Sequence, residues 1–172
     1  CQKVTNERKG LDYLFEALRS KPMHHWQGQL GLVVVGEMAE DVAYSVPFPI
    51  YRQDYIKEEE DMALLYRAVD LFVTPSLEEN LPNTIMEAMA CATPCVGFNI
   101  GGIPEMIDHE KNGYVARYRD AEDLAQGINF VLDEEHYDDL SANAAHKAVE
   151  AWNEESVVRR HIELYEKMVE EE

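Results

Sequence analysis

The sequence has little cysteine, little positive charge and no long apolar run. Its three cysteines, Cys1, Cys91 and Cys95, are too few for a disulfide framework, which favours reduced thiols in a cytoplasmic protein. Lys and Arg number 15 against 34 Asp and Glu, and this net charge of −19 argues against nucleic acid as a partner and allows at most peripheral membrane contact. No apolar run approaches the roughly 20 residues that span a bilayer, and no signal peptide is recognisable.

The few basic residues are unevenly placed. Residues 1–30 hold five basic and three acidic residues and form the only net-positive stretch, so an anionic ligand is expected near them. Metal-ligand spacing is lacking as well. Cys91 and Cys95 are separated by Pro94 without a nearby His, which favours buried thiols over a zinc site.

Short apolar runs alternate with longer amphipathic stretches along the 172 residues. Strands are predicted at residues 30–35, 49–55, 70–75, 94–98 and 114–116, and helices at residues 10–18, 59–69, 80–91, 104–107, 121–132, 138–152 and 154–170. Strands separated by helices, without hairpin signals, predict an α/β fold with one doubly wound parallel sheet. Ligands of such sheets bind at the carboxyl ends of the strands.

The sharpest motif lies in residues 76–90, where Glu79 and Glu87 are eight positions apart. Asn80 is predicted to cap the helix that follows, with Pro82 in its first turn. The two carboxylates would either accept hydrogen bonds from ligand hydroxyls or lie in solvent, with Glu79 complementing the helix dipole. Spacing alone favours the solvent-exposed interpretation.

Two other loops have residues suited to an anionic ligand. Lys3, Arg8 and Lys9 precede the first helix, where they would neutralise a diphosphate or form a solvated basic loop. Gly101 and Gly102 follow a predicted strand, where they would let the backbone approach a ligand or simply form a tight turn. Neither a G-x-G-x-x-G motif nor a P-loop is present.

Residues 74–107 resemble the donor-binding signature of retaining glycosyltransferases of the GT-B fold, of the group 1 or family 4 type. That signature is Glu, seven residues, Glu, then Ala-Met-Ala, a small residue, Pro, a strand and a Gly-Gly-x-x-Glu loop, and this sequence follows it in register from Glu79 to Glu105. Residues 8–14 resemble the family's Lys-Gly helix start. The likeness covers essentially the whole chain.

The resemblance implies a role for each matching residue. Glu79 would be the catalytic residue that binds hydroxyls of the transferred sugar, Glu87 would bind the nucleotide ribose, and Lys9 the diphosphate. The base pocket is expected near residues 51–54. Pro82 and Ala92 depart from the family pattern, and Pro82 removes a backbone donor. The implied donor-binding residues are Lys3, Arg8, Lys9, Asn80, Leu81, Glu87, Gly101 and Gly102.

The resemblance also implies what acts together with the chain. Residues 1–172 would be the C-terminal, nucleotide-sugar-binding half of a GT-B enzyme, a Rossmann-like unit. The acceptor-binding N-terminal domain and most of a strand before Lys3 would be missing from the sequence. The donor would be a UDP-, GDP- or ADP-sugar, no metal or other cofactor would be needed, and the acceptor would be a glycan or a lipid-linked sugar. The half alone is expected to be inactive.

Three alternatives remain open from the residues. One is an enzyme of the epimerase type that acts on a nucleotide sugar with the same fold. Another is a non-catalytic α/β binding module, such as a receiver-like domain, although the strand at residues 70–73 ends in Thr74 and Pro75 rather than in an acidic residue. A third is a glycosyltransferase-like domain without activity, suggested by Lys3 in place of Arg and by Pro82.

Overall fold

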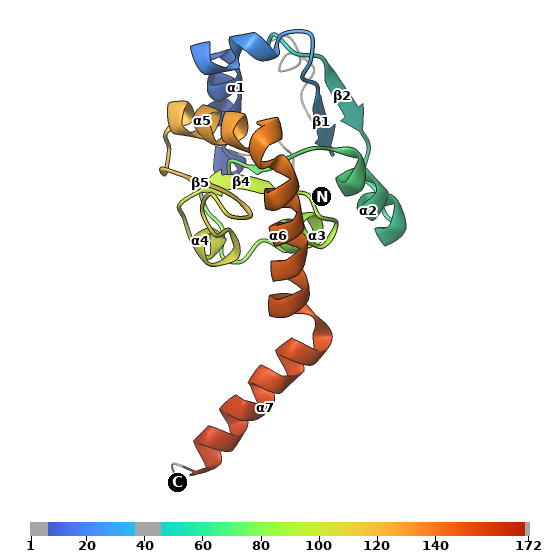
Figure 1. Ribbon diagram of the computed structural model, residues 1–172, viewed down its shortest axis with the longest axis vertical. Helices are drawn as coiled ribbons and strands as arrows, with labels where there is room; N and C mark the ends of the chain where they lie inside the picture. Colours follow the sequence, from blue (N-terminus) through green and yellow to red (C-terminus); the bar gives the residue numbers. More distant parts are fainter. Residues whose placement is uncertain (1–6, 37–45, 171–172) are drawn as a thin grey trace.

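The computed structural model describes residues 7–36 and 46–170, and it has an α/β fold with parallel strands (Figure 1). Every predicted helix and strand is present, most with ends shifted by a few residues and α7 with the predicted bounds. The strands are β1 Leu32–Val35, β2 Ile50–Gln53, β3 Phe72–Thr74, β4 Cys95–Phe98 and β5 Gly113–Ala116. The helices are α1 Leu11–Arg19, α2 Glu59–Ala68, α3 Asn83–Ala90, α4 Ile103–Met106, α5 Ala121–Val131, α6 Glu134–Trp152 and α7 Glu154–Glu170, with short 3₁₀ helices η1 Glu7–Lys9 and η2 Lys21–Trp26.

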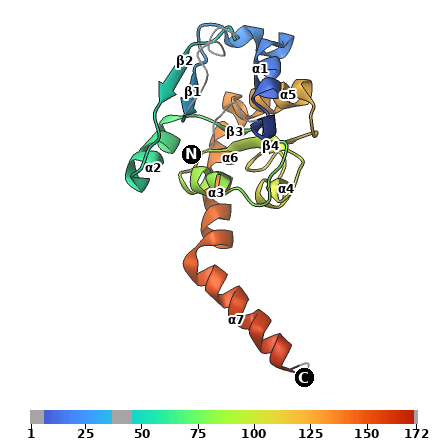
Figure 2. The ribbon, with the colours of Figure 1, turned by 180° about the vertical axis from the view of Figure 1, so that it is seen from behind.

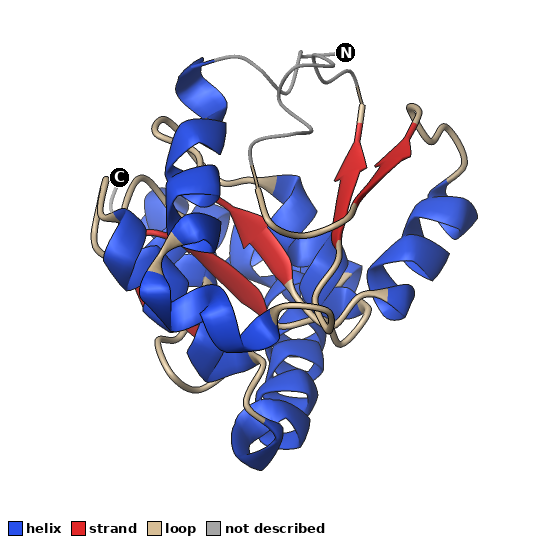
Figure 3. Cartoon of the chain, turned by 90° about the horizontal axis from the view of Figure 1, so that it is seen from above, coloured by secondary structure: helices blue, strands red, loops and turns tan. Residues whose placement is uncertain are grey.

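The strands form two parallel sheets rather than the single predicted one. β1 pairs with β2, with Leu32 opposite Ile50, and β4 lies between β3 and β5, with Val96 opposite Val73 and Tyr114. Figure 3 shows the β1–β2 pair set apart from the other strands. Within the described residues β1 and β3 belong to different sheets and exchange no ladder hydrogen bonds.

Each face of the three-stranded sheet is covered by helices, as a doubly wound fold requires (Figure 2). Successive side chains of β4 alternate between the faces. Val96 and Phe98 belong to the core with α1 and α5, whereas Cys95 belongs to the core with α3 and α6. Cys95 is fully buried, its thiol pKa is raised by burial, and the half-buried Cys91 is likewise free.

The predicted cap of the third helix is wrong. Pro82, not Asn80, is the N-cap of α3, and its carbonyl oxygen accepts a hydrogen bond from the Ile85 N–H at 3.0 Å. The helix therefore begins at Asn83, because Pro82 has an extended ψ of 115°. Glu79 and Asn80 consequently remain in the loop after β3, which is free to fold against other loops.

Helix α7 extends away from the rest of the molecule and packs chiefly on α6 (Figure 1). Several of its large apolar side chains are exposed, namely Val158, Ile162, Leu164, Tyr165, Met168 and Val169. None of the helices in the described ranges has the length and apolar character that crossing a membrane requires.

Candidate functional site

The loop after β3 is bound to the segment that precedes α1. The Leu77 N–H donates to the Arg8 carbonyl oxygen at 2.7 Å. Gly10 has a φ of 62°, and a Cβ placed there would lie 1.8 Å from the carbonyl oxygen of Pro75, so only glycine allows this approach. The basic segment that the sequence pointed to therefore lies at the carboxyl end of β3.

The contact between the loop after β3 and the segment before α1 brings two predicted site residues, Lys9 and Glu79, together. The Lys9 ammonium donates to the Glu79 carboxylate, with Nζ 2.8 Å from Oε1. The Glu79 side chain is only 17% exposed, whereas the Lys9 side chain is 40% exposed. Beside them, Arg8 and Glu78 form a second ion pair at 2.8 Å, with both side chains largely in solvent. Two cations and two carboxylates thus gather at this edge of the sheet.

Gly101 and Gly102 bring the loop after β4 against the same place. A Cβ at Gly101, which has a φ of 54°, would lie 1.9 Å from the carbonyl oxygen of Glu79. The Gly102 N–H donates to the carbonyl oxygen of Asn80 at 2.6 Å. The glycines therefore permit close contact between two loops, and this contact fixes the backbone that carries Glu79.

Glu87 lies on the exposed side of α3 and is held by one side chain. The Tyr66 hydroxyl donates to its Oε2 at 3.1 Å, from the last turn of α2. Tyr66 itself is 3% exposed, and burial, followed by the negative charge of Glu87, raises the pKa of its hydroxyl. Because Glu87 is exposed, its carboxylate does not incur the burial cost that its apolar neighbours in the sequence suggested.

A cleft of about 1210 Å³ runs between the β1–β2 pair and the three-stranded sheet. Most of its wall is apolar and consists of side chains from β1, β3, α1 and α2, which gives it the character of a domain interior. Its polar lining residues include Lys9 and Ser76, which lie beside the carboxyl end of β3, and Thr84 and Glu87 of the following helix α3. Tyr51, in the segment predicted for the base pocket, also lines it.

The structure thus brings together most of the predicted residues, but in two adjoining groups. Lys9, Glu79, Asn80, Gly101 and Gly102 belong to the meeting loops, and Glu87 lies on the cleft wall, with Lys9 shared by both. Leu81 is exposed beside the first group. Lys3 lies outside the described residues.

Three residues at the site, Tyr66, Ser76 and Thr84, are not among the site residues predicted from the sequence. Tyr66 lies in the helix predicted at residues 59–69, where an aromatic residue at helical spacing is typical of a core. Ser76 and Thr84 had a positional signal, because Ser76 follows directly on a buried strand and Thr84 lies three positions before Glu87 on one helix.

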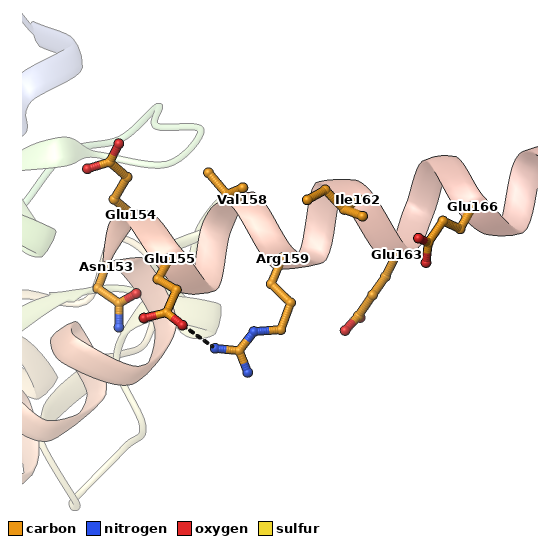
Figure 4. A pocket seen from close by; sticks show the side chains of 8 residues that line it. All are labelled: Asn153, Glu154, Glu155, Val158, Arg159, Ile162, Glu163 and Glu166. Carbon is orange, nitrogen blue, oxygen red and sulfur yellow. Dashed lines mark ion pairs between the residues drawn. The ribbon is translucent and has the colours of Figure 1, made fainter.

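A second hollow runs along α7, shown in Figure 4. All of its lining residues come from positions 153–166, and they include four Glu side chains, one of which, Glu155, pairs with Arg159 at 3.8 Å. Since α7 and the residue just before it supply the whole lining, polar groups do not converge on a ligand from several elements there. Within the described ranges, no group of three or more His, Cys, Asp and Glu is placed to hold a metal ion.

Known proteins with the same features are glycosyltransferases. Residues 2–134 match the family model described as "Glycosyl transferases group 1". An uncharacterized glycosyltransferase of Methanocaldococcus jannaschii is 27% identical over 92% of this chain and 42% of its own length. The UDP-Gal:alpha-D-GlcNAc-diphosphoundecaprenol alpha-1,3-galactosyltransferase of Escherichia coli is 30% identical over 63% of this chain and 28% of its own length.

The fold has solved counterparts too. The crystal structure of Anabaena HepE in complex with UDP superposes with a TM-score of 0.80 over 96% of this chain and 47% of that one, at 20% identity. The chain spans less than half the length of each of these proteins. Its α/β unit is the Rossmann-like half of a GT-B fold. The family match over residues 2–134, together with the paired carboxylates and glycines of the site, identifies the chain as a member of the group 1 glycosyl transferases.

Proposed function

We propose that this chain is the donor-binding, C-terminal domain of a retaining glycosyltransferase, with the diphosphate of a nucleotide sugar at Lys9. The observation that carries the proposal is the 2.8 Å contact between Lys9 and Glu79 at the carboxyl end of β3. A diphosphate needs a cation, and the hydroxyls of a sugar need acceptors. Both groups are present here within one hydrogen bond of each other.

Each residue of the site has a part in this proposal. The Lys9 ammonium, with Arg8 nearby, stabilises the negative charge that develops on the diphosphate as the sugar leaves, which is electrostatic catalysis by a preorganised cation. Glu79 accepts hydrogen bonds from hydroxyls of the sugar. The backbone N–H groups of Asn80 and Leu81 lie in the same loop and are further donors for the sugar or phosphate, whereas Pro82 offers none.

Glu87 accepts a hydrogen bond from the nucleotide ribose in this arrangement. It lines the same cleft as Lys9, so a nucleotide whose diphosphate is at Lys9 would extend along that wall. Gly101 and Gly102 act indirectly by fixing Glu79 and Asn80. Lys3 is kept as a second cation for the diphosphate from the resemblance alone. We assign no role to a metal ion, because cationic side chains supply the charge that a metal would otherwise provide.

A uridine diphosphate sugar is the proposed donor, and a lipid-linked sugar or glycan the acceptor. The Escherichia coli relative is named for UDP-Gal and a diphosphoundecaprenol acceptor, and the Anabaena structure is of a complex with UDP. The acceptor would bind mainly to a partner domain outside residues 1–172. The chain alone should therefore bind the donor and transfer no sugar.

Titration calorimetry against UDP, GDP, ADP, UMP and uridine tests the proposal. UDP is expected to bind more tightly than UMP and uridine, because only the diphosphate reaches the Lys9 ammonium. Equal affinity for UDP and uridine would contradict the placement of the diphosphate. A second assay mixes the chain with UDP-galactose in the absence of acceptor. Unchanged UDP-galactose is expected, and an epimerised product would show that the chain is a nucleotide-sugar epimerase instead.

A further inference from the structure

Tyr66 is the one described side chain that holds the Glu87 carboxylate. Within residues 7–36 and 46–170, the hydrogen bond from the Tyr66 hydroxyl to Oε2 is the sole hydrogen bond or ion pair of the Glu87 side chain. The two residues come from different helices, α2 and α3, and are 21 positions apart in the sequence. Both residues line the cleft.

The Tyr66 ring is itself fixed from several directions. It packs edge-on against Phe72 of β3, with ring centroids 5.7 Å apart, and it belongs to the core that contains Ile85 and Met89. The buried Thr93 hydroxyl donates to the carbonyl oxygen of Tyr66 at 2.7 Å, which fixes the backbone as well. The phenol oxygen is therefore a rigid donor at the surface of a packed core.

Glu87, in contrast, is a long and exposed side chain. A free glutamate at a helix surface populates several rotamers, and binding a ligand would require it to adopt one of them. The Tyr66 hydroxyl engages Oε2 and so selects one orientation before any ligand arrives. Oε1 then remains available to accept a hydrogen bond.

We propose that Tyr66 is a positioning residue that orients the Glu87 carboxylate for the ribose hydroxyls of the donor. This inference rests on the proposed role of Glu87 and adds a specific helper to it. The hydroxyl has only one proton to donate, and burial together with the nearby Glu87 charge keeps it protonated, since both raise its pKa. Tyr66 therefore acts as a donor to the carboxylate and never competes with it as an anion.

A purely structural role is the alternative, in which the bond only ties α2 to α3. The UDP affinities of three variants separate the positioning role from the structural one: Tyr66→Phe, Glu87→Gln and the double variant. A second ligand, 2′,3′-dideoxy-UDP, lacks the ribose hydroxyls. Tyr114→Phe is the matched control, because it deletes another tyrosine hydroxyl that donates to a carboxylate, that of Asp123 at 3.2 Å, and Tyr114 lies outside the cleft lining.

We expect Tyr66→Phe to weaken UDP binding about threefold to tenfold, the effect of freeing one side chain. In the Glu87→Gln background, Tyr66→Phe should change the UDP affinity by less than about twofold. When Glu87 is present and dideoxy-UDP is the ligand, Tyr66→Phe should also change the affinity by less than about twofold. Tyr114→Phe should leave the UDP affinity near that of the wild type, whatever its effect on the melting temperature.

Three results would overturn the inference. If Glu87→Gln weakens UDP binding but Tyr66→Phe does not, Tyr66 has no positioning role, while the proposed function stands. If Tyr66→Phe is equally harmful with and without Glu87, its effect does not pass through the carboxylate. A Glu87→Gln variant with wild-type affinity would instead remove the ribose role of Glu87, and the proposal for Tyr66 with it.

Discussion

The Lys9 ammonium lies 2.8 Å from the Glu79 carboxylate, although the two residues are 70 positions apart. Each group satisfies the other in the structure, and both would have to accept new partners when a donor binds. A partly exposed ion pair of this kind contributes only about 0–1 kcal/mol to stability. A diphosphate would therefore compete for the ammonium at little cost.

Lys9→Met should lower the affinity for UDP and leave the affinity for uridine unchanged. The cation is lost while most of the side-chain volume is kept, and a hydrogen bond to a charged group contributes about 1.5–3 kcal/mol, or roughly tenfold to a hundredfold in affinity. Calorimetry with both ligands measures the effect.

Lys21→Met is the matched control, since Lys21 is an exposed lysine at the start of η2 and lies outside the cleft lining. It should bind UDP as the wild type does. Equal losses in both variants would indicate a general effect of net charge rather than a site at Lys9.

Gly101→Ala should destabilise the fold. The new Cβ has an unfavourable φ of 54° and would clash with the Glu79 carbonyl oxygen, so the two loops must separate or the backbone must shift. We expect a loss of about 1–3 kcal/mol in the free energy of unfolding in urea.

Gly28→Ala separates backbone strain from the steric clash, because Gly28 has a φ of 80° but no atom within 4 Å of its ideal Cβ position. This substitution should lower the free energy of unfolding by about 1 kcal/mol, from backbone strain alone. If Gly101→Ala is no more destabilising than Gly28→Ala, the close contact between the loops is not present in solution.

Asp120→Ala tests the cap of α5. The Asp120 carboxylate accepts a hydrogen bond from the Asp123 N–H at 3.0 Å, and this bond, with help from Arg117, lowers the pKa of Asp120. Loss of an N-cap costs about 0.5–2 kcal/mol. Urea unfolding of both proteins at neutral pH measures the difference.

The pH dependence of the stabilisation by Asp120 follows from the lowered pKa of its carboxyl group. A carboxyl with a lowered pKa stabilises the fold above its unfolded pKa of about 3.9. That contribution disappears as the pH falls through the lower, folded pKa. The gap between wild type and Asp120→Ala should therefore be constant from pH 7 to 5 and shrink below about pH 4. A gap that widens on acidification would contradict the assignment.

Met89→Ala should be among the costliest single substitutions. Met89 is completely buried on α3 and belongs to the core that also contains Ile85 and Ile103. Truncation leaves a cavity that typically costs about 2–5 kcal/mol in the free energy of unfolding. Met168→Ala on α7, where the side chain is 60% exposed, should change it by less than about 0.5 kcal/mol. Similar effects in the two variants would mean that the α3 core is not packed as described.

The positions of most helices and strands were predictable because their apolar periodicity agrees with their packing. β4 illustrates this, since its run of apolar residues is buried on both faces of the sheet. The separation of β1 from β3 was not predictable, because the apolar pattern of a buried strand is the same whether or not it pairs with a particular neighbour. The cap at Asn80 was wrong because Pro82 has a backbone conformation that cannot belong to the helix.

For the site, the resemblance carried more information than spacing. Spacing alone favoured a solvent-exposed Glu87, and Glu87 is indeed exposed, yet it also lines the cleft. The interpretation of Gly101 and Gly102 as a tight turn missed their contact with Glu79 and Asn80, which tertiary packing creates. Tyr66 gave no signal, because the same residue at the same spacing suits an ordinary core. The donor, the lack of a metal and a cytoplasmic location remain predictions.

The central claim is that the chain binds a nucleotide sugar through Lys9 and Glu87, and calorimetric titration of Glu87→Gln with UDP tests it most directly. Glu16→Gln is the matched control, because Glu16 is an exposed glutamate on α1 outside the cleft lining. We expect the wild type and Glu16→Gln to bind UDP with equal affinity. Glu87→Gln should bind about tenfold more weakly, with an unchanged melting temperature. Equal affinity in all three proteins would contradict it.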